Sequence, residues 1–342
     1  MSKKLRDTPF SILDLVTYPE GGDLQEAFAA SRELAQHAEK LGYLRYWIAE
    51  HHNLEGIASA ATVVLMGYIA GETAKIRVGS GGIMLPNHAP FIVAEQIGTL
   101  EALYPGRIDL GIGRAPGGDQ MTALAMGQGR YPGADNFPEQ VQYLVAYLDA
   151  ALPAEHPFAR VKVMPEGPTA PQVWLLGSSD YSGALAAQLG LRFAFAHFIS
   201  ADGGDAVMRD YHRSYRRSAR EPEPRSLLCV FVICAETAEE AERLTASINL
   251  RRLNMDYGVN APVPDHEEAA RYPYTEADHR RIAQHRRRVV AGTPTAVREK
   301  LAEMANVFAA DELMAITITG DYASRLRSYE LLAEAFGLCQ PG

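Results

Sequence analysis

The chain has 342 residues, of which 47% are hydrophobic and 22% charged, a balance typical of a soluble globular protein. Its 42 acidic residues outnumber its 33 lysines and arginines, so the formal net charge is −9, which argues against a nucleic-acid-binding surface because such a surface must be basic. Three cysteines exclude a disulfide framework, no apolar run follows the charged first residues, and the uncharged stretch 57–71 is shorter than the roughly 20 residues of a membrane span. We therefore expect a cytoplasmic protein that binds neither nucleic acid nor membranes.

Short apolar, β-branched runs alternate along the chain with longer segments of helical period. In chain order, the predicted strands are 10–15, 46–49, 77–86, 107–114, 173–177, 192–196, 227–235 and 313–319. Helices are predicted between them at 23–41, 59–72, 90–104, 138–152 and 184–189. Two later helices begin at Thr237, which opens a capping box, and at Thr293, which precedes a proline.

Eight β–α units in regular alternation predict an α/β fold, a closed (β/α)8 TIM barrel that forms one domain over residues 1–342. The alternative is a doubly wound sheet with a second domain, which is disfavoured because no linker rich in Pro, Ser and Gly is present. One irregular block, 251–288, lies between the seventh and eighth strands and carries three prolines and a run of arginines. We interpret this block as an insertion over the barrel mouth that acts as a lid.

In such a barrel the active site lies at the carboxyl ends of the strands, and four of these ends carry polar or glycine residues. The second strand runs into Glu50-His51-His52-Asn53. A histidine there could act as an acid or base or bond a loop carbonyl, and we predict no metal site because the H-E-x-x-H spacing is absent. The third strand carries Gly79-Ser80-Gly81-Gly82, which indicates either a bulge that closes the barrel or a flat ring against the backbone.

The fourth strand ends in Gly111-Ile112-Gly113-Arg114-Ala115-Pro116. This run looks like a dinucleotide fingerprint, but Pro116 stands where the third glycine belongs and no helix is predicted to open there, so we reject that interpretation. Arg114 could hold a phosphate, a substrate anion or a negatively charged reduced ring. The structural alternative is an ion pair with Asp109 or Asp119.

The fifth strand ends in Gly177-Ser178-Ser179-Asp180-Tyr181-Ser182-Gly183 and leads into a helix. Backbone N–H groups of the first helical turn, with hydroxyl groups beside them, form a cradle for a phosphate. Serine and aspartate are also ordinary N-cap residues, so capping alone is the other interpretation. Asp180 would repel a phosphate unless its side chain points away.

Taken together, these segments are similar to the bacterial luciferase-like flavin-dependent monooxygenase family. The matching segments are 46–52, 78–90, 104–114 and 176–179. Their order and spacing carry the resemblance, which covers nearly the whole predicted barrel and is weakest over 251–288. The resemblance implies a (β/α)8 barrel, usually a homodimer, that binds reduced FMN or the deazaflavin F420 at the strand ends.

The resemblance also assigns roles to particular residues. His51 would lie beside the reacting edge of the ring as an acid/base or hydrogen-bond donor, and Arg114 would stabilise negative charge on the reduced flavin or its phosphate. A non-prolyl cis peptide would join two glycines against the ring, and a phosphate loop would follow the fifth strand. The implied cofactor-binding residues are Gly81, Gly82, Gly177, Ser178, Ser179, Tyr181 and Ser182.

The implied reaction uses reduced FMN, supplied by a separate flavin reductase, and O2 to oxidise a small organic substrate through a C4a-peroxyflavin. Gly113 stands where bacterial luciferase has a cysteine, which leaves room near the reactive carbon and argues against light emission. One alternative is an F420-dependent hydride-transfer oxidoreductase on the same fold, for which the arginines at 280–288 would hold the cofactor tail. Another is a flavin-binding protein without turnover. The helices 59–72 and 90–104 are the candidate dimer contacts because small side chains allow close packing. The alternative is that both helices simply cover the barrel.

Overall fold

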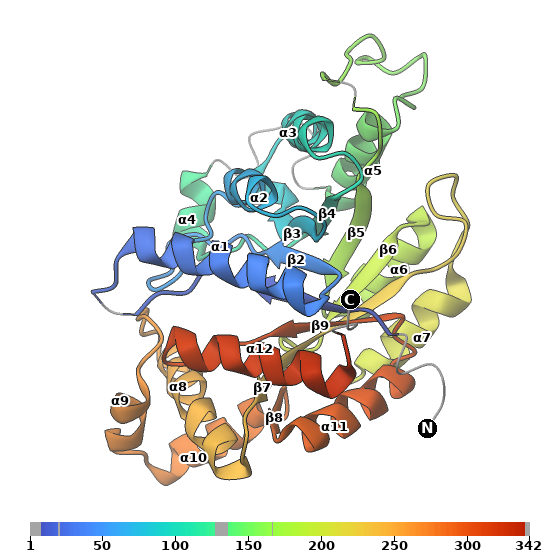
Figure 1. The fold of residues 1–342 in the computed structure, drawn as a ribbon. Helices are drawn as coiled ribbons and strands as arrows, with labels where there is room; N and C mark the ends of the chain where they lie inside the picture. Colours follow the sequence, from blue (N-terminus) through green and yellow to red (C-terminus); the bar gives the residue numbers. More distant parts are fainter. Residues whose placement is uncertain (1–7, 20, 127–135, 166, 339–342) are drawn as a thin grey trace.

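Eight parallel strands close into a barrel in the computed structural model, which describes residues 8–19, 21–126, 136–165 and 167–338 (Figure 1). The barrel strands are β1 (Phe10–Asp14), β2 (Arg45–Ile48), β3 (Arg77–Met84), β4 (Ile108–Gly113), β5 (Gln172–Gly177), β6 (Arg192–Ala196), β7 (Ser226–Cys234) and β9 (Glu312–Ile316). A ninth strand, β8 (Val289–Gly292), pairs with β7 outside the ring. From β1 to β7 each strand pairs in parallel with the next, and β9 pairs with both β7 and β1, which closes the ring. The predicted barrel is confirmed. The expectation that no signal peptide is present rests on residues 1–7, which lie outside the described residues.

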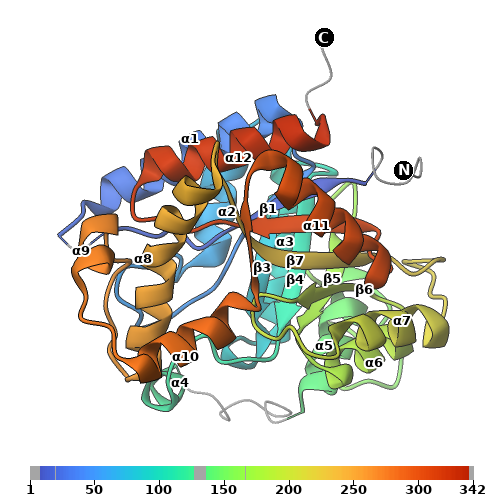
Figure 2. The same ribbon diagram turned by 90° about the horizontal axis from the view of Figure 1, so that it is seen from below.

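Helices wrap the outside of the barrel, as the two perpendicular views show (Figures 1 and 2). They are α1 (Leu24–Leu41), α2 (Thr62–Gly71), α3 (Pro90–Leu103), α4 (Gln120–Ala125), α5 (Phe137–Leu148), α6 (Asp180–Leu189), α7 (Gly204–Ser214), α8 (Ala238–Asp256), α9 (His266–Arg271), α10 (Glu276–Arg286), α11 (Pro294–Val307) and α12 (Tyr322–Phe336). A single 3-10 turn, Leu85–Asn87, follows β3.

The helix ends follow the sequence signals closely. Asp23 caps the start of α1, and Gly42 ends that helix with a φ of 88°, a conformation that favours glycine. Thr237 caps α8 by accepting the N–H of Glu240. The reciprocal half of the predicted capping box is not formed, because the carboxylate of Glu240 pairs with Arg243 instead.

The segment 251–288 is not the irregular block that the sequence predicts, because most of it is helical. α8 continues to Asp256, and α9 and α10 follow, each with a capping side chain at its start, Asp265 and Thr275. Ion pairs one turn apart within α9 and α10 help to stabilise these short polar helices. The unpredicted strand β8 then pairs with the second half of β7, so the strand expected at 313–319 is β9. α8, α9 and α10 lie together in both views.

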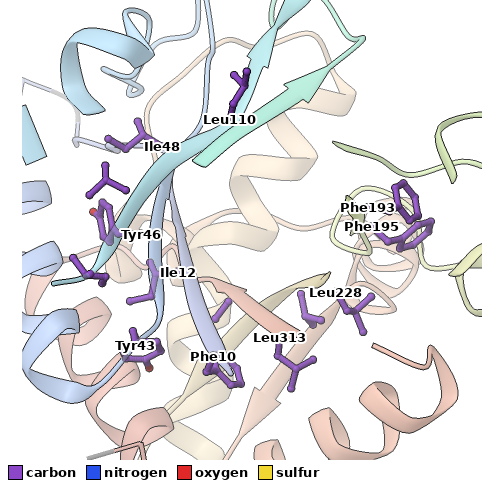
Figure 3. Close-up of a cluster of buried hydrophobic side chains, with 14 of the residues drawn as sticks. Phe10, Ile12, Tyr43, Tyr46, Ile48, Leu110, Phe193, Phe195, Leu228 and Leu313 are labelled. Atoms are coloured by element: carbon purple, nitrogen blue, oxygen red, sulfur yellow. The ribbon is translucent and has the colours of Figure 1, made fainter. Parts of the chain in front are cut away.

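The apolar core has two layers because successive side chains of a strand point to opposite faces. Outward-facing side chains, among them those of Tyr46 and Phe193, pack under the helices (Figure 3). The inward-facing side chains of Trp47 and Trp174 fill the barrel, with their rings edge to face at a centroid distance of 5.5 Å. In β7, Cys229 belongs to the inner layer, whereas Cys234 belongs to the outer one.

Charged side chains close the amino-terminal end of the barrel and form what we call the barrel floor: Arg45, Arg77, Asp109 and Glu312. Arg45 donates to Asp109 over 2.8 Å and to Glu312 over 2.7 Å, and Arg77 donates to Asp109 over 2.7 Å. The indole N–H of Trp47 donates to Asp109 over 2.9 Å. Burial acts to raise the pKa of Asp109, but the two guanidinium groups hold it below its usual value. A ligand cavity is therefore expected at the opposite end, where the strands have their carboxyl ends.

Candidate active site

The carboxyl ends of β3 to β6 surround a cavity of about 240 Å3. Its apolar wall includes Trp47, Leu176 and Cys229. Its polar wall holds seven of the nine predicted site residues: Gly81, Gly82, Arg114, Gly177, Ser178, Ser179 and Ser182. Larger hollows of about 560 Å3 flank α5 and α11 and contain none of the nine. The predicted residues therefore converge because the strand order follows the chain order, which brings consecutive strand ends together.

The peptide bond between Gly81 and Gly82 is cis, as the resemblance implies. A Cβ atom on Gly82 would lie 2.8 Å from the carbonyl oxygen of Gly111, and one on Gly81 would lie 2.5 Å from a methyl group of Leu13. The pairing of β3 with β4 also shifts register between Ser80 and Ile83. The bulge that the glycines suggested is therefore present, and neither Gly81 nor Gly82 has room for a side chain.

Three serine hydroxyls gather where β5 passes into α6. Ser179 is the N-cap residue of α6, but its side chain makes no capping hydrogen bond. Within the described part of the chain, the hydroxyls of Ser178, Ser179 and Ser182 have no hydrogen-bond partner, and all three residues line the cavity. The carboxylate of Asp180 is exposed and accepts the N–H of Tyr181 over 2.8 Å. Capping thus does not account for these serines, and the hydroxyls are available to a ligand beside the helix N-terminus.

Arg114 lines the same cavity, and its guanidinium group lies 4.5 Å from the ring centroid of Tyr181. The alternative interpretation of Arg114, an ion pair with Asp109 or Asp119, is wrong. Asp109 is engaged by the barrel floor, and Asp119 caps α4 and accepts from Asn53 over 2.9 Å. Among the described residues Arg114 forms no ion pair, so its charge is free to meet an anion. Tyr181 supports this side chain rather than lining the cavity.

His51 lies outside the cavity wall, in the loop after β2. Its backbone N–H donates to Ser59 over 3.2 Å, whereas its ring Nδ1 is buried without a hydrogen-bond partner. Burial, and then the positive charge of Arg251 on α8, lower the pKa of His51 to about 4. The imidazole is therefore neutral near pH 7.

The buried carboxylate of Glu50, for which the sequence predicted no role, binds several groups at the carboxyl ends of β2 and β3. Glu50 is 2% exposed and accepts from the rings of His52 and His88 over 2.9 Å, from the side chain of Asn87 and from the backbone N–H of Met84. Burial acts to raise the pKa of Glu50, but these donors hold it below its usual value. The contacts tie the loop after β2 to the turn after β3. Glu50 and His88 both fall in the matching segments, but 38 residues separate them, and no spacing signal links them.

The family model of the luciferase-like monooxygenases matches residues 8–311. The chain belongs to the luciferase-like monooxygenase family. A relative from Escherichia coli (strain K12) named luciferase-like monooxygenase is 42% identical over 94% of this chain and 95% of its own length. N-acetyl-S-alkylcysteine monooxygenase of Bacillus subtilis (strain 168) is 34% identical over 95% of this chain and 97% of its own.

Several solved structures share the fold. Apo-MsnO8 superimposes with a TM-score of 0.88 at 38% identity, over 97% of this chain and 98% of that chain. Two structures at lower identity show the fold alone. One is the oxygenating constituent of 3,6-diketocamphane monooxygenase from Pseudomonas putida in complex with FMN, with a TM-score of 0.70 at 18% identity over 96% and 97% of the two chains. The other is an F420-dependent secondary alcohol dehydrogenase with an F420–acetone adduct, with a TM-score of 0.72 at 13% identity over 96% and 99%.

Within this luciferase-like barrel, the room expected beside Gly113 is filled. A Cβ atom on Gly113 would lie 2.8 Å from Cε and 2.9 Å from Sδ of Met84. The thioether of Met84 occupies the place that the absent cysteine side chain was expected to leave open. A side chain at position 113 would therefore require the side chain of Met84 to move.

The arginines at 280–288 do not form a free basic surface. Arg280 pairs with Glu276, and Arg286 and Arg287 pair with acidic residues of other elements. Arg288 donates to the carbonyl oxygen of Ile199 over 2.9 Å. Within the described ranges no group of three or more His, Cys, Asp or Glu side chains is arranged to hold a metal ion, and no helix is long and apolar enough to cross a membrane.

Proposed function

We propose that this chain is an FMN-dependent monooxygenase that uses reduced FMN and O2 to oxidise a small organic substrate. The observation that carries the proposal is the combination in one cavity of the glycine pair Gly81 and Gly82, three unengaged serine hydroxyls and an unpaired arginine. Membership of the luciferase-like family supports it. So does the relative named N-acetyl-S-alkylcysteine monooxygenase, which spans almost the whole chain.

The residues present fit a flavin mononucleotide. A planar ring can approach the backbone at Gly81 and Gly82, where no Cβ atom intervenes. The phosphate would lie against Ser178, Ser179 and Ser182 at the N-terminus of α6, where the helix dipole contributes about 0.3–1 kcal/mol. Reduced FMN, once bound, would supply the electrons that activate O2.

The chain's own residues then have three tasks. The neutral ring of His51 holds or moves a proton at its free nitrogen near the reacting edge. Arg114 stabilises negative charge on the ring or the phosphate. The apolar wall around Trp47 and Leu176 excludes water, and the segment 251–288 acts as the lid over the mouth.

The deciding experiment is an anaerobic titration of reduced FMN and reduced F420 into the purified protein, followed by rapid mixing with O2. We expect tight binding of reduced FMN and a transient absorbance that matches neither the reduced nor the oxidised flavin. Binding of F420 alone, without a reaction with O2, would make the protein a hydride-transfer enzyme instead. Binding of FMN without O2 consumption, even with a flavin reductase and NADH present, would make it a flavin carrier.

His51→Ala tests the proton role. The variant should bind FMN as the wild type does but oxidise substrate roughly 10²–10⁴-fold more slowly, the usual contribution of a positioned acid–base group. His37→Ala is the matched control, because His37 lies on the outer helix α1 and pairs with Glu330. Equal turnover of the His51 variant and the wild type would remove His51 from the mechanism.

We also propose a homodimer that buries the outer faces of α2 and α3. These neighbouring helices carry exposed apolar side chains (Figure 1): Val64 is 70% and Leu103 62% exposed, and Tyr68 and Ile92 are exposed as well. Val64→Glu should therefore shift the mass measured by light scattering towards that of a monomer. A variant that remains dimeric would show that the interface does not include this face.

A further inference from the structure

Three arginines are buried in the described part of the chain, and one of them lacks an acidic partner. Arg45 pairs with Asp109, and Arg325 pairs with Asp14. Arg251, on α8, is 6% exposed, and its hydrogen bond is a donation to the backbone carbonyl of Ala261. No carboxylate within the described ranges pairs with it.

The next residue repeats the pattern. Arg252 is half-buried, donates to the carbonyl oxygen of His285 over 3.3 Å and lies 4.8 Å from the ring centroid of Phe231. Within the described residues it too lacks an acidic partner. Burial, and then the charge of Arg288, lower the pKa of Arg252 to about 10. Two adjacent guanidinium groups are thus withdrawn from water without a negative charge beside them.

An uncompensated buried charge is costly, and proteins normally pair buried arginines. A fold that keeps one at a barrel mouth is therefore prepared for an anion that arrives from solution. A planar guanidinium group matches a carboxylate through two parallel hydrogen bonds, which makes arginine suited to hold one in a fixed orientation.

The position of the two arginines points to the substrate rather than to the cofactor phosphate. The charge of Arg251 acts on His51, whose ring Nδ1 is also buried without a partner. The ring of Phe231, which Arg252 contacts, belongs to the inner layer of the barrel. So does Ile248, which precedes Arg252 by one turn of α8. The serine cradle at the end of β5 is three strands around the barrel from β2, which leads to His51.

We infer that Arg251, assisted by Arg252, binds the carboxylate of the substrate, so that the substrates of this enzyme are small organic carboxylates. This inference rests on the proposed function and names its substrate class. It assigns the lid segment a direct role in recognition. A neutral aldehyde or alkane would leave both guanidinium groups unpaired and should bind poorly.

Calorimetric titration of two matched probe pairs, with and without saturating oxidised FMN, tests the assignment. The pairs are N-acetyl-L-methionine with its neutral amide, and octanoate with octanamide. In the wild type we expect at least one carboxylate to bind about tenfold or more tightly than its amide. Arg251→Gln should abolish that preference, and Arg251→Lys, which keeps the charge but not the planar fork, should reduce it. Arg271→Gln, which removes an exposed arginine on α9, should leave it unchanged.

The titration requires no turnover, so its outcome is separate from that of the anaerobic FMN experiment. A wild type that prefers no carboxylate over its amide overturns the inference, and so does a preference that survives in folded Arg251→Gln, with folding checked by circular dichroism. If Arg251→Gln does not fold, the same comparison is made with Arg251→Lys and Arg252→Gln, and undiminished preference in both overturns the inference. An equal loss of FMN affinity in the Arg251 variant would assign the guanidinium group to the cofactor and would also overturn it.

Discussion

Replacement of Asp109 by asparagine should destabilise the barrel strongly although the side chains have nearly the same shape. The barrel floor balances two positive charges, on Arg45 and Arg77, against the two negative charges of Asp109 and Glu312. Asp109→Asn leaves this buried group with a net charge of +1. Each carboxylate oxygen of Asp109 accepts from two donors, so the new amide group faces two N–H groups that it cannot accept from.

The size of the loss in folding stability depends on which of the two carboxylate oxygens of Asp109 the amide nitrogen of the asparagine replaces. Breaking a buried ion pair costs about 3–5 kcal/mol. We expect the lower end, about 3 kcal/mol, because the amide nitrogen can turn towards Arg77, whose side chain is 16% exposed and can regain water. Arg45, which lies deeper, would keep an acceptor and its contacts with Glu312.

Urea unfolding followed by tryptophan fluorescence measures this loss. The chain has two tryptophans, and both lie inside the barrel, one of them hydrogen-bonded to Asp109. The control is Glu223→Gln, which breaks an ion pair between exposed side chains and should cost between about 0 and 1 kcal/mol. If Asp109→Asn lowers the free energy of unfolding by no more than the control does, at an unchanged denaturant slope, the charge-balance argument fails.

Two further predictions concern the site and its surroundings. A Cβ atom on Gly177 would lie 2.2 Å from the hydroxyl oxygen of Ser182, so Gly177→Ala should displace the cradle and weaken FMN binding by about 1–3 kcal/mol, roughly 5- to 150-fold, in a fluorescence titration. Gly67→Ala, where the nearest atom would be 3.4 Å away on a flexible side chain, should leave FMN binding unchanged and is the control. Burial, and then nearby cations, lower the pKa of His197 to about 4, whereas an unfolded histidine titrates near 6.5. Because the unfolded chain then binds the extra proton, stability should fall between about pH 6.5 and pH 4 by up to about 1.4 kcal/mol per pH unit from this group. His197→Phe should flatten that slope in urea unfolding at pH 7, 6 and 5, and an unchanged slope would show that His197 does not contribute to it.

Much of the fold was predictable because it depends on local patterns. Runs of period 2 and 3.6 located the strands and most helices, and Asp23 and Gly42 marked the ends of α1. The strand β8 was not predicted, because its four residues, Val289–Gly292, are too few to show a period and follow a run of arginines. The helices α9 and α10 were missed because polar helices held by caps and ion pairs lack an apolar stripe.

The site was predictable to the extent that chain order determines which strand ends meet. Gly81, Arg114 and Ser178 converge because β3, β4 and β5 are neighbours in both sequence and space. The contacts of Glu50 and the unpaired charge of Arg251 were not predictable, because each depends on which side chains a folded loop brings within hydrogen-bond distance. Such contacts join residues far apart in the sequence and leave no periodic signal.

The cysteine in the cavity wall bears on how the protein would tolerate the proposed O2 chemistry. Enzymes that reduce O2 release some hydrogen peroxide, and peroxide attacks cysteine as the thiolate. Burial raises the pKa of the Cys229 thiol far above neutrality, so this side chain remains protonated and reacts slowly. The thioether of Met84, in the same wall, has no such protection because its sulfur needs no ionisation to be oxidised. Oxidative ageing of this enzyme should therefore begin at methionine, whose sulfoxide is repaired by reductases, and spare the cysteine.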